Sequence, residues 1–371
     1  MTRLRELRVE RVQLRFTEPV RYGAMTTSIR EAGIVRLHTD DDLEGLGEIG
    51  SPVVALETLV GVLELAADLR GIDVADGPAL DEALARSLPA IPQAHHLRAA
   101  VETAALDVCG RACGSPVRDL LGGGSDRIRV NALLLANPRG GEPRAIGAVA
   151  ALLVAAGFRC LKLKREVGSP GLEAALRAIR ESVGPSVALR LDLNGDLTEH
   201  GAIEWLRTLA WADLEYAEQP IPASLGPQAL ARVRRAVPMP IAADEAVTDP
   251  DAAAELLLTD ACDVLVVKPA RVGGPRQAHR IVRAATEAGV GVTISTLYET
   301  GIGLAAAAQV AATVPGDGAH GLGTGAFLED DLVGGAMVVR DGTLALPDGP
   351  GLGVTLDEAA LERHRTPWLR V

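Results

Sequence analysis

The first third of the chain changes from an alternating to a helical pattern of apolar residues. Apolar and polar side chains alternate over 7–16 and 33–39, and a turn-like acidic run then leads into a third short strand at 46–48. From residue 55 to 110 the apolar positions recur every three to four residues, and 98–121 is a further long helical run. Alternation indicates strands and the longer period indicates helices. The pattern therefore predicts an α+β unit, with strands first and helices after.

After residue 126, short β-rich runs alternate with Ala- and Leu-rich helical runs. The runs that predict strands are 129–135, 160–164, 187–193, 214–219, 241–245, 264–268, 290–296 and 319–324. The runs between them that predict helices include 173–183, 202–211, 229–236, 251–258 and 276–288. Strands that alternate with helices form parallel β/α units, and apolar strands of this kind are covered on both faces. The pattern predicts an α/β fold, a β/α barrel over residues 127–326.

The residues after the barrel return to the strand-and-turn pattern of the first unit. Residues 337–346 resemble a hairpin around Asp341-Gly342, a dipeptide that favours tight turns between strands. A glycine- and proline-rich loop follows at 347–353. We expect this tail to pack against the first unit, so that residues 1–126, completed by 327–371, form a capping domain.

Composition and charge narrow the classes of function. The chain of 371 residues is 48% apolar, which is enough for two domains with a large core. The net charge of −12 argues against nucleic acid and against an anionic membrane as partners. The four cysteines are too scattered for a disulfide framework or a zinc site, so we expect them to be reduced. The N-terminus is too charged for a secretory signal, and the longest apolar stretch is too short for a bilayer, so we expect a cytoplasmic protein.

Charged side chains end five successive predicted strands. In chain order they are Lys162 and Lys164, Asp192 (followed by the neutral Asn194), Glu218, Asp244 and Glu245, and Lys268. From Lys164 to Lys268 they recur every 24 to 28 residues, about the length of one β/α unit. Active sites of β/α barrels lie at the carboxyl ends of the strands, so these groups are predicted to converge on one mouth.

The order of these charges suggests a chemistry. Three carboxylates cannot share a small volume in ionised form without a cation, and oxygen ligands of this kind suit Mg²⁺, with Mn²⁺ as an alternative. No histidine ends a strand before the eighth, which argues against zinc. A lysine near a divalent cation and a second lysine has a lowered pKa, towards the ~7–8 that suits a general base. A metal that binds a carboxylate offsets the charge formed when its α-proton leaves.

These motifs resemble the enolase superfamily, in its muconate lactonizing enzyme subgroup. The matching segments are Lys162-Leu-Lys164, Asp192-Leu-Asn194, Glu218-Gln-Pro, Asp244-Glu245 and Lys268-Pro-Ala-Arg-Val-Gly-Gly. The resemblance implies a modified (β/α)8-type barrel, (β/α)7β, with an α+β capping domain. It implies that Asp192, Glu218 and Asp244 bind the metal and that Lys164 and Lys268 flank a small carboxylate substrate. Lys162, Asn194 and Glu245 would support these groups. Homo-oligomers are expected.

The subgroup contains several reactions, and the ends of the seventh and eighth strands bear on the choice among them. Residues 294–304 and 320–324 resemble segments of o-succinylbenzoate synthases, although Thr296 replaces a serine and Gly323 an aspartate. The first hypothesis is therefore dehydration of 2-succinyl-6-hydroxy-2,4-cyclohexadiene-1-carboxylate, with Lys164 as the base, through an enediolate. The alternatives are an N-acylamino acid racemase, a dipeptide epimerase and a muconate-type cycloisomerase. Dipeptide epimerases usually carry Asp-x-Asp after the eighth strand, and 323–327 has none.

Further residues are predicted to contact the substrate. Two groups are expected to do so: Ser295, Thr296, Glu299 and Gly301 after the seventh strand, and Ser28 and Arg30 in a lid-like segment at 22–30. Gly301 begins a predicted helix, and the backbone N–H groups of the first turn of that helix are expected to bind a substrate carboxylate. A non-catalytic barrel would be expected to have lost part of the charged set, but all five groups are present.

Overall fold

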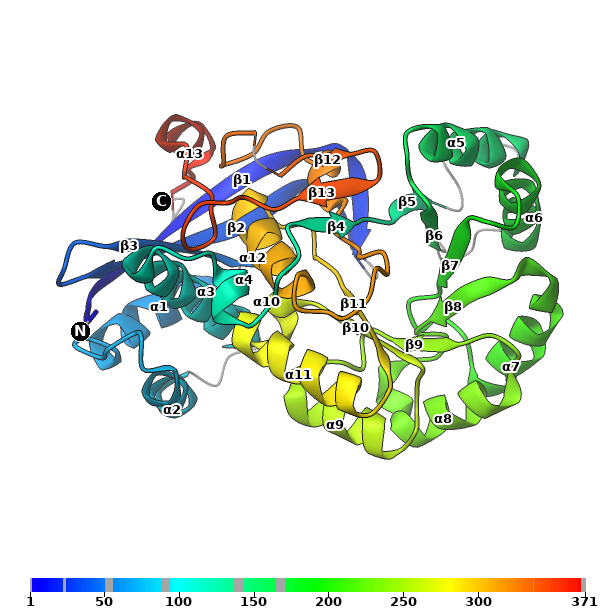
Figure 1. The fold of residues 1–371 in the computed structure, drawn as a ribbon, viewed down its shortest axis with the longest axis horizontal. Helices are drawn as coiled ribbons and strands as arrows, with labels where there is room; N and C mark the ends of the chain where they lie inside the picture. Colours follow the sequence, from blue (N-terminus) through cyan, green and yellow to red (C-terminus); the bar gives the residue numbers. More distant parts are fainter. Residues whose placement is uncertain are drawn as a thin grey trace.

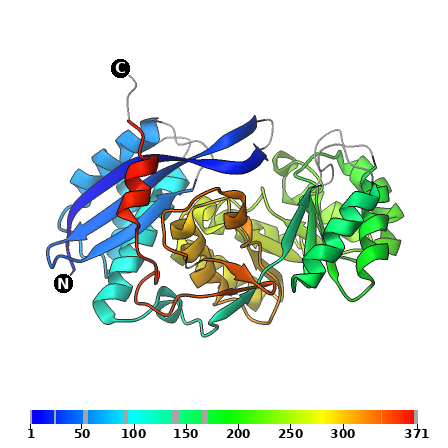
Figure 2. The ribbon, with the colours of Figure 1, turned by 90° about the horizontal axis from the view of Figure 1, so that it is seen from above.

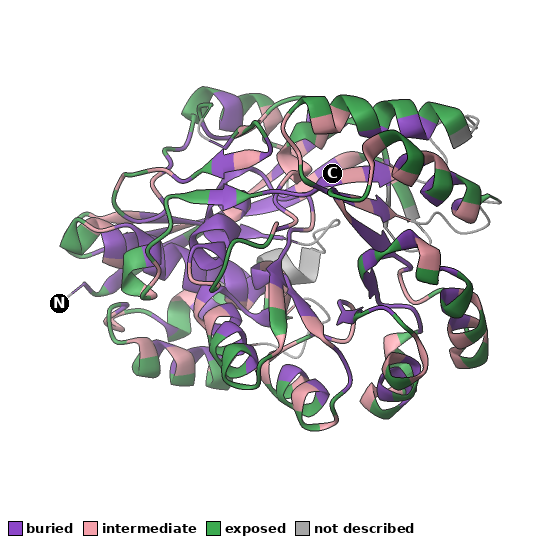
Figure 3. Cartoon of the chain, turned by 45° about the vertical axis from the view of Figure 1, so that its right-hand side comes forward, coloured by how far each residue is buried: buried purple, intermediate pink, exposed green. Residues whose placement is uncertain are grey.

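The computed structural model consists of an antiparallel sheet with helices, joined to a curved parallel sheet with its own helices (Figure 1). It describes residues 2–22, 25–50, 56–88, 94–135, 143–164, 171–335 and 337–367. Buried residues concentrate in the strands and on the inward faces of the helices (Figure 3). The α/β class expected from the sequence is confirmed.

The capping domain is built on three antiparallel strands, β1 (Leu4–Tyr22), β2 (Met25–Thr39) and β3 (Glu44–Ile49). Its helices are α1 (Leu56–Asp68), α2 (Gly77–Ser87), α3 (Ala94–Cys113) and α4 (Val117–Leu120). The sheet contributes to two cores: Leu7 and Leu37 pack with the capping helices, whereas Val12 and Leu14 join the core of the barrel. The strands therefore tie the capping domain to the barrel.

The barrel sheet has seven parallel strands in the order β11-β10-β9-β8-β7-β6-β5. They are β5 (Ala132–Leu135), β6 (Cys160–Lys164), β7 (Ala188–Asp192), β8 (Leu214–Glu218), β9 (Ile241–Ala243), β10 (Val264–Val267) and β11 (Gly291–Ile294). The α-helices are α5 (Pro143–Ala155), α6 (Leu172–Val183), α7 (Glu199–Thr208), α8 (Pro227–Ala236), α9 (Pro250–Leu258), α10 (Pro269–Val272), α11 (Pro275–Glu287) and α12 (Gly301–Ala311). Short 3₁₀ turns are η2 (Ala210–Ala212), η3 (Ala223–Leu225) and η4 (Thr324–Phe327).

Two of the predicted strands differ in the structure. The stretch 319–324 makes only isolated parallel bridges, from His320 to Val130 and from Gly321 to Ser295, which link the two edges of the sheet. Its glycines weaken a regular strand. The stretch 129–135 is divided, because residues up to Arg129 belong to β4 (Arg127–Arg129), which pairs with the C-terminal tail.

The C-terminal tail contacts both parts of the chain (Figure 2). The predicted hairpin is confirmed as β12 (Val339–Arg340) and β13 (Thr343–Ala345), with positive φ at Asp341 and Gly342, as a type I′ turn requires. The hairpin pairs with β4, and later parts of the tail bridge to β1, from Leu328 to Phe16 and from Arg365 to Val12. Further along, helix α13 (Glu358–His364) lies against β1.

The four cysteines are free, in agreement with the sequence. No helix in the described ranges combines the length and apolarity needed to cross a membrane.

A buried carboxylate joins the capping domain to the barrel. Glu102 on α3 is fully buried, and its Oε1 accepts a hydrogen bond of 2.6 Å from the backbone N–H of Arg276, in the first turn of α11. Its Oε2 has no hydrogen-bond partner among the described residues. Burial raises the pKa of Glu102 from 4.5 to about 7, although Arg276 opposes the shift.

This raised pKa leads to an expected pH dependence of stability. An acid whose pKa is higher in the folded state stabilises the fold below its unfolded pKa, and this contribution is lost as pH rises towards the folded pKa. Between about pH 5 and pH 8, wild type should therefore lose on the order of 3 kcal/mol of unfolding free energy relative to Glu102→Gln, which stays neutral. Urea denaturation of both proteins at the two pH values measures this difference. A pH-independent difference would show that Glu102 does not carry the effect.

Candidate active site

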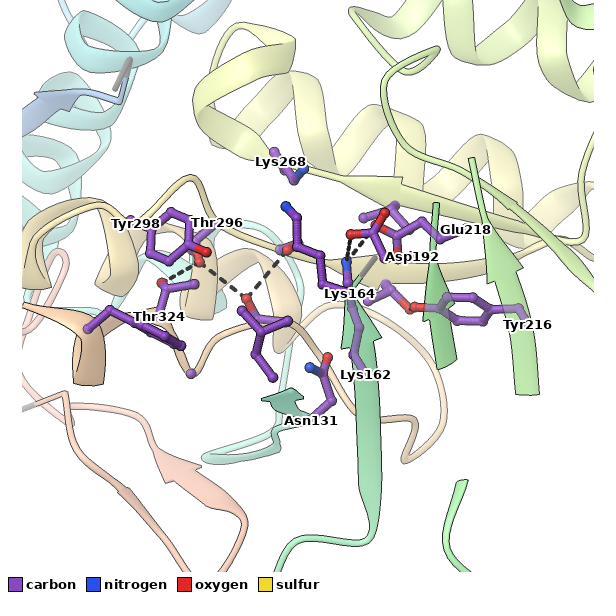
Figure 4. A pocket seen from close by; sticks show the side chains of 17 residues that line it. Asn131, Lys162, Lys164, Asp192, Tyr216, Glu218, Lys268, Thr296, Tyr298 and Thr324 are labelled. Atoms are coloured by element: carbon purple, nitrogen blue, oxygen red, sulfur yellow. Dashed lines mark hydrogen bonds and ion pairs between the residues drawn. The ribbon is translucent and has the colours of Figure 1, made fainter. Parts of the chain in front are cut away.

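Lys162, Lys164, Asp192, Glu218 and Lys268 line one pocket at the carboxyl edge of the barrel sheet, with a cavity of about 60 Å³ (Figure 4), whereas Asp244 and Glu245 are not part of its lining. Its lining residues are Asn131, Leu133, Lys162, Lys164, Asp192, Tyr216, Glu218, Val266, Lys268, Thr293, Ser295, Thr296, Tyr298, Gly321, Gly323, Thr324 and Phe327. On most strands the lining residues are two positions apart, because alternate side chains of a strand point into the barrel. The predicted convergence of Lys164, Asp192, Glu218 and Lys268 is what the structure places here.

Lys162 bridges two of the carboxylates. Its Nζ lies 2.9 Å from Oδ2 of Asp192 and 2.6 Å from Oε1 of Glu218. Burial lowers the pKa of Lys162, but Asp192 and Glu218 outweigh this effect and raise it well above its usual range. Burial and the neighbouring Asp192 raise the pKa of Glu218 to about 8. The amine of Lys162 therefore offsets only part of the negative charge.

Asp244 is paired with two cations. Its Oδ2 lies 2.7 Å from Nζ of Lys268, and its Oδ1 lies 2.7 Å from Nη1 of Arg271. Burial raises the pKa of Asp244, but Arg271 and Lys268 outweigh it and hold the pKa well below its usual range. Burial and the neighbouring Arg271 lower the pKa of Lys268. Arg271 was not predicted as a site residue. It follows Lys268 by three residues, in the first turn of α10, and residues three apart on a helix lie on the same face.

Lys164 reaches into the middle of the pocket (Figure 4). It makes no hydrogen bond or ion pair with any residue in the described part of the chain. Burial lowers its pKa, but Asp192 outweighs that effect, so that the pKa of Lys164 is raised. Lys164 is half-buried, and an amine that lines a pocket without being engaged by a neighbour is well placed to exchange a proton with a bound molecule.

The three carboxylates fit a hard cation by their chemistry. They lie at the ends of the consecutive strands β7, β8 and β9, and Oε2 of Glu218 is buried without a hydrogen-bond partner among the described residues. Asp192 and Asp244 both raise the pKa of Glu218, which indicates uncompensated negative charge. As the side chains stand, no three His, Cys, Asp or Glu residues in the described part of the chain are grouped to hold a metal ion, and the amines of Lys162 and Lys268 lie against the carboxylates.

Two polar residues with positive φ make hydrogen bonds that stabilise these strand ends. Asn194 (φ 46°) donates from its backbone N–H to Asp192 and from Nδ2 to Oε1 of Glu245, at 3.1 Å each. Gln219 (φ 39°) accepts at Oε1 from the backbone N–H of Asp244 at 3.0 Å. Asn194 and Glu245 were predicted to support the site, and Gln219 was not considered.

The loop after β11 supplies hydroxyl groups to the pocket. Ser295 and Thr296 line it, as predicted for substrate contacts, and the Oγ1 atoms of Thr296 and Thr324 lie 2.7 Å apart. Thr324 occupies the region where dipeptide epimerases were expected to carry acidic residues. This side of the pocket is thus built from neutral hydrogen-bonding groups.

Four further predictions of substrate contacts need correction. The N–H of Gly301 donates to Oδ1 of Asp331 at 2.7 Å, so it is already engaged within the protein. Glu299 is buried beside a different small cavity, next to Glu48. Arg30 is fully buried in an ion pair with Glu48, and Ser28 is an exposed residue on β2 that does not line the pocket.

Several pocket residues were missed from the sequence. They are Asn131, Tyr216, Thr293, Tyr298, Thr324 and Phe327. Tyr216 lies two positions before Glu218, so strand alternation would have placed it inside the barrel. The same alternation applies to Asn131, two positions before Leu133, and to Thr293, two positions before Ser295. Tyr298, Thr324 and Phe327 lie outside the strands, where no periodicity indicates the direction of a side chain.

A parallel β/α barrel with lysines and carboxylates at successive strand ends, covered by an α+β domain, defines a class of barrel enzymes whose active site lies at the carboxyl ends of the strands. Residues 4–122 match the N-terminal domain family of mandelate racemase and muconate lactonizing enzyme, and 145–360 match the family described as enolase C-terminal domain-like. The chain therefore belongs to the enolase superfamily, as its motifs predicted.

Individual relatives extend over nearly the whole chain. The N-succinylamino acid racemase of Thermus thermophilus is 31% identical, over 98% of this chain and 97% of that protein. The L-Ala-D/L-Glu epimerase of Bacillus subtilis is 29% identical, over 94% of this chain and 96% of that protein. A crystal structure of muconate lactonizing enzyme from Pseudomonas fluorescens with muconolactone superposes with a TM-score of 0.87 at 27% identity, covering 98% of this chain and all of that chain.

Proposed function

We propose that this enzyme removes the α-proton of a small carboxylate that carries a succinyl arm, and that its main reaction is racemization of N-succinylamino acids. The observation that carries the proposal is that the amines of Lys164 and Lys268 line the same pocket, with Asp192 and Glu218 beside them. Racemization needs one base on each face of the α-carbon.

The direction in which the pKa of Lys268 is shifted agrees with a second base. A lysine that only stabilises negative charge should stay protonated, whereas a second base must lose its proton near neutral pH. Burial and Arg271 lower the pKa of Lys268, which supports its use as a base. Lys164 acts as the base on the other face; Asp192 raises its pKa as the side chains stand, and the charge of a bound Mg²⁺ would lower it. The N-succinylamino acid racemase among the relatives provides the substrate class.

The proposed cofactor is Mg²⁺, held by Asp192, Glu218 and Asp244. When bound, it offsets the negative charge that develops on the substrate carboxylate after proton removal. Lys162 stays protonated between Asp192 and Glu218 and orients them. The hydroxyls of Ser295, Thr296 and Thr324 can hydrogen-bond to the acyl arm of the substrate.

The second candidate is o-succinylbenzoate synthase. It is supported by the segments at 294–304 and 320–324, and its substrate also carries a succinyl arm and an acidic α-proton. Dehydration needs one lysine for proton transfer, so this candidate makes no use of the lowered pKa of Lys268. Muconate cycloisomerization and dipeptide epimerization find support among the relatives alone.

Proton exchange in deuterium oxide tests the proposal. Purified enzyme with Mg²⁺ should introduce deuterium at the α-carbon of both enantiomers of N-succinylphenylalanine. The optical rotation of a solution of either enantiomer should fall at a matching rate. The same preparation is given 2-succinyl-6-hydroxy-2,4-cyclohexadiene-1-carboxylate. Formation of o-succinylbenzoate without exchange into the amino acid would replace the first candidate by the second, and neither reaction would contradict both.

A further inference from the structure

The loop between β11 and α12, residues 295–300, contains a residue in an unusual backbone conformation. Tyr298 has φ 64°, in the left-handed region that residues other than glycine, asparagine and aspartate seldom occupy. Its side chain is 8% exposed and lines the pocket together with Ser295 and Thr296. A tyrosine keeps such a conformation only where its surroundings fix it.

The capping domain provides that support through one buried ion pair. Arg30 on β2 and Glu48 on β3 pair at 3.0 Å, and both side chains are 0% exposed. Arg30 also donates from Nε to the carbonyl oxygen of Tyr298 at 2.9 Å. Glu48 accepts from Oγ1 of Thr300 at 2.7 Å and from the N–H of Gly303 at 3.1 Å. The pair therefore holds both the tyrosine and the first turn of α12.

The ring of Tyr298 is also clamped between the two parts of the chain. It packs edge-to-face on Phe16 of β1, with centroids 5.7 Å apart, and on Phe327 of η4, with centroids 5.5 Å apart. In the view of Figure 4, Tyr298 lies on one side of the Lys164 amine, and Asp192 and Glu218 lie on the other. The tyrosine thus forms a wall of the pocket opposite the carboxylates.

We propose that Tyr298 is a specificity-determining residue, a wall beside Lys164 that limits the size of the substrate, and that the Arg30–Glu48 pair of the capping domain positions it. The part that concerns substrate size rests on the function proposed above. Arg30 does not line the pocket, so it is a positioning residue. The capping domain in this way sets the shape of the pocket from outside it.

The positioning step is tested by amide hydrogen exchange, without any substrate. Arg30→Lys keeps the charge opposite Glu48 but loses the planar fork that also reaches the Tyr298 carbonyl. Exchange of the amides at 297–303 should become at least about 10-fold faster, since this loop then opens more often. The matched control is Arg36→Lys, which removes the fork of another Arg–Glu pair between the same two strands, Arg36 with Glu44. Unchanged exchange in Arg30→Lys, or the same increase in the control, would overturn the positioning role.

The wall is tested by substrate selection. Two ratios of kcat/KM are measured: N-succinylphenylalanine to N-succinylalanine, and N-succinylphenylalanine to N-acetylphenylalanine. Tyr298→Ala should change at least one of them by about 10-fold or more, because the shape of a pocket discriminates between substrates on this scale. Tyr298→Phe keeps the ring and should keep both ratios. Unchanged ratios in Tyr298→Ala would overturn the proposal. If wild type processes none of these compounds, the proposed function fails, and the exchange measurement still decides the role of Arg30.

Discussion

Replacing Lys164 by methionine is expected to reduce kcat for racemization by about 10²- to 10⁴-fold, the contribution of a positioned general base. Methionine keeps most of the length and apolar volume of the lysine stem but cannot carry a proton. Because Lys164 makes no hydrogen bond or ion pair within the described residues, its loss should leave the fold unchanged. Racemization is followed by polarimetry, and circular dichroism checks the fold.

Isotope exchange distinguishes the two lysines. Each base should serve one enantiomer, so Lys164→Met should abolish deuterium incorporation from one enantiomer of an N-succinylamino acid, and Lys268→Met from the other. A single-base dehydratase would behave differently, because Lys268→Met would then slow turnover without this division. Equal exchange of both enantiomers in Lys164→Met would exclude Lys164 as a base.

Replacing Glu218 by glutamine is expected to abolish the effect of Mg²⁺ on stability and on activity. A ligand that binds only the folded protein stabilises it, by about 2.7 kcal/mol at a concentration 100-fold above its Kd. Wild type should therefore show a higher unfolding temperature with Mg²⁺ than with EDTA, and Glu218→Gln should not, because a neutral amide is a poor ligand for this cation.

The unfolding temperature also tests the metal without substrate. Glu204→Gln is the control, since Glu204 is an exposed carboxylate on α7 whose one ion pair within the described residues is with His200 in the same helix. This control should keep the full response to Mg²⁺. A wild-type protein whose unfolding temperature does not respond to Mg²⁺ or Mn²⁺ would contradict the assignment of Asp192, Glu218 and Asp244 as ligands.

Much of the fold could be predicted because the barrel repeats one signal. Runs such as 160–164 and 214–219 are apolar, short and evenly spaced, and the structure has strands at both. The prediction was wrong at 319–324, where glycines leave only single bridges, and at 129–135, where one run is shared between two sheets. Whether such a run forms a regular strand depends on the strands with which it pairs, and the local sequence pattern does not identify those strands.

The substrate contacts were harder to predict than the charged groups. Arg30 and Glu299 are polar residues that were predicted to contact the substrate, but the structure buries both at the junction with the capping domain. Gly301 opens a helix whose first N–H is already used by Asp331. Whether a polar group faces the substrate or another part of the protein depends on what the second domain brings against it.

The sequence by itself determined the barrel, its capping unit and the five charged strand ends, because strand period and spacing fix which side chains reach the mouth. Only the tertiary structure decided which amine bridges which carboxylate, since Lys162 and Lys268, rather than Lys164, form the close ion pairs. It also decided that the capping domain holds Tyr298 through Arg30 and Glu48. Contacts between residues hundreds of positions apart depend on how the domains dock, which no local pattern records.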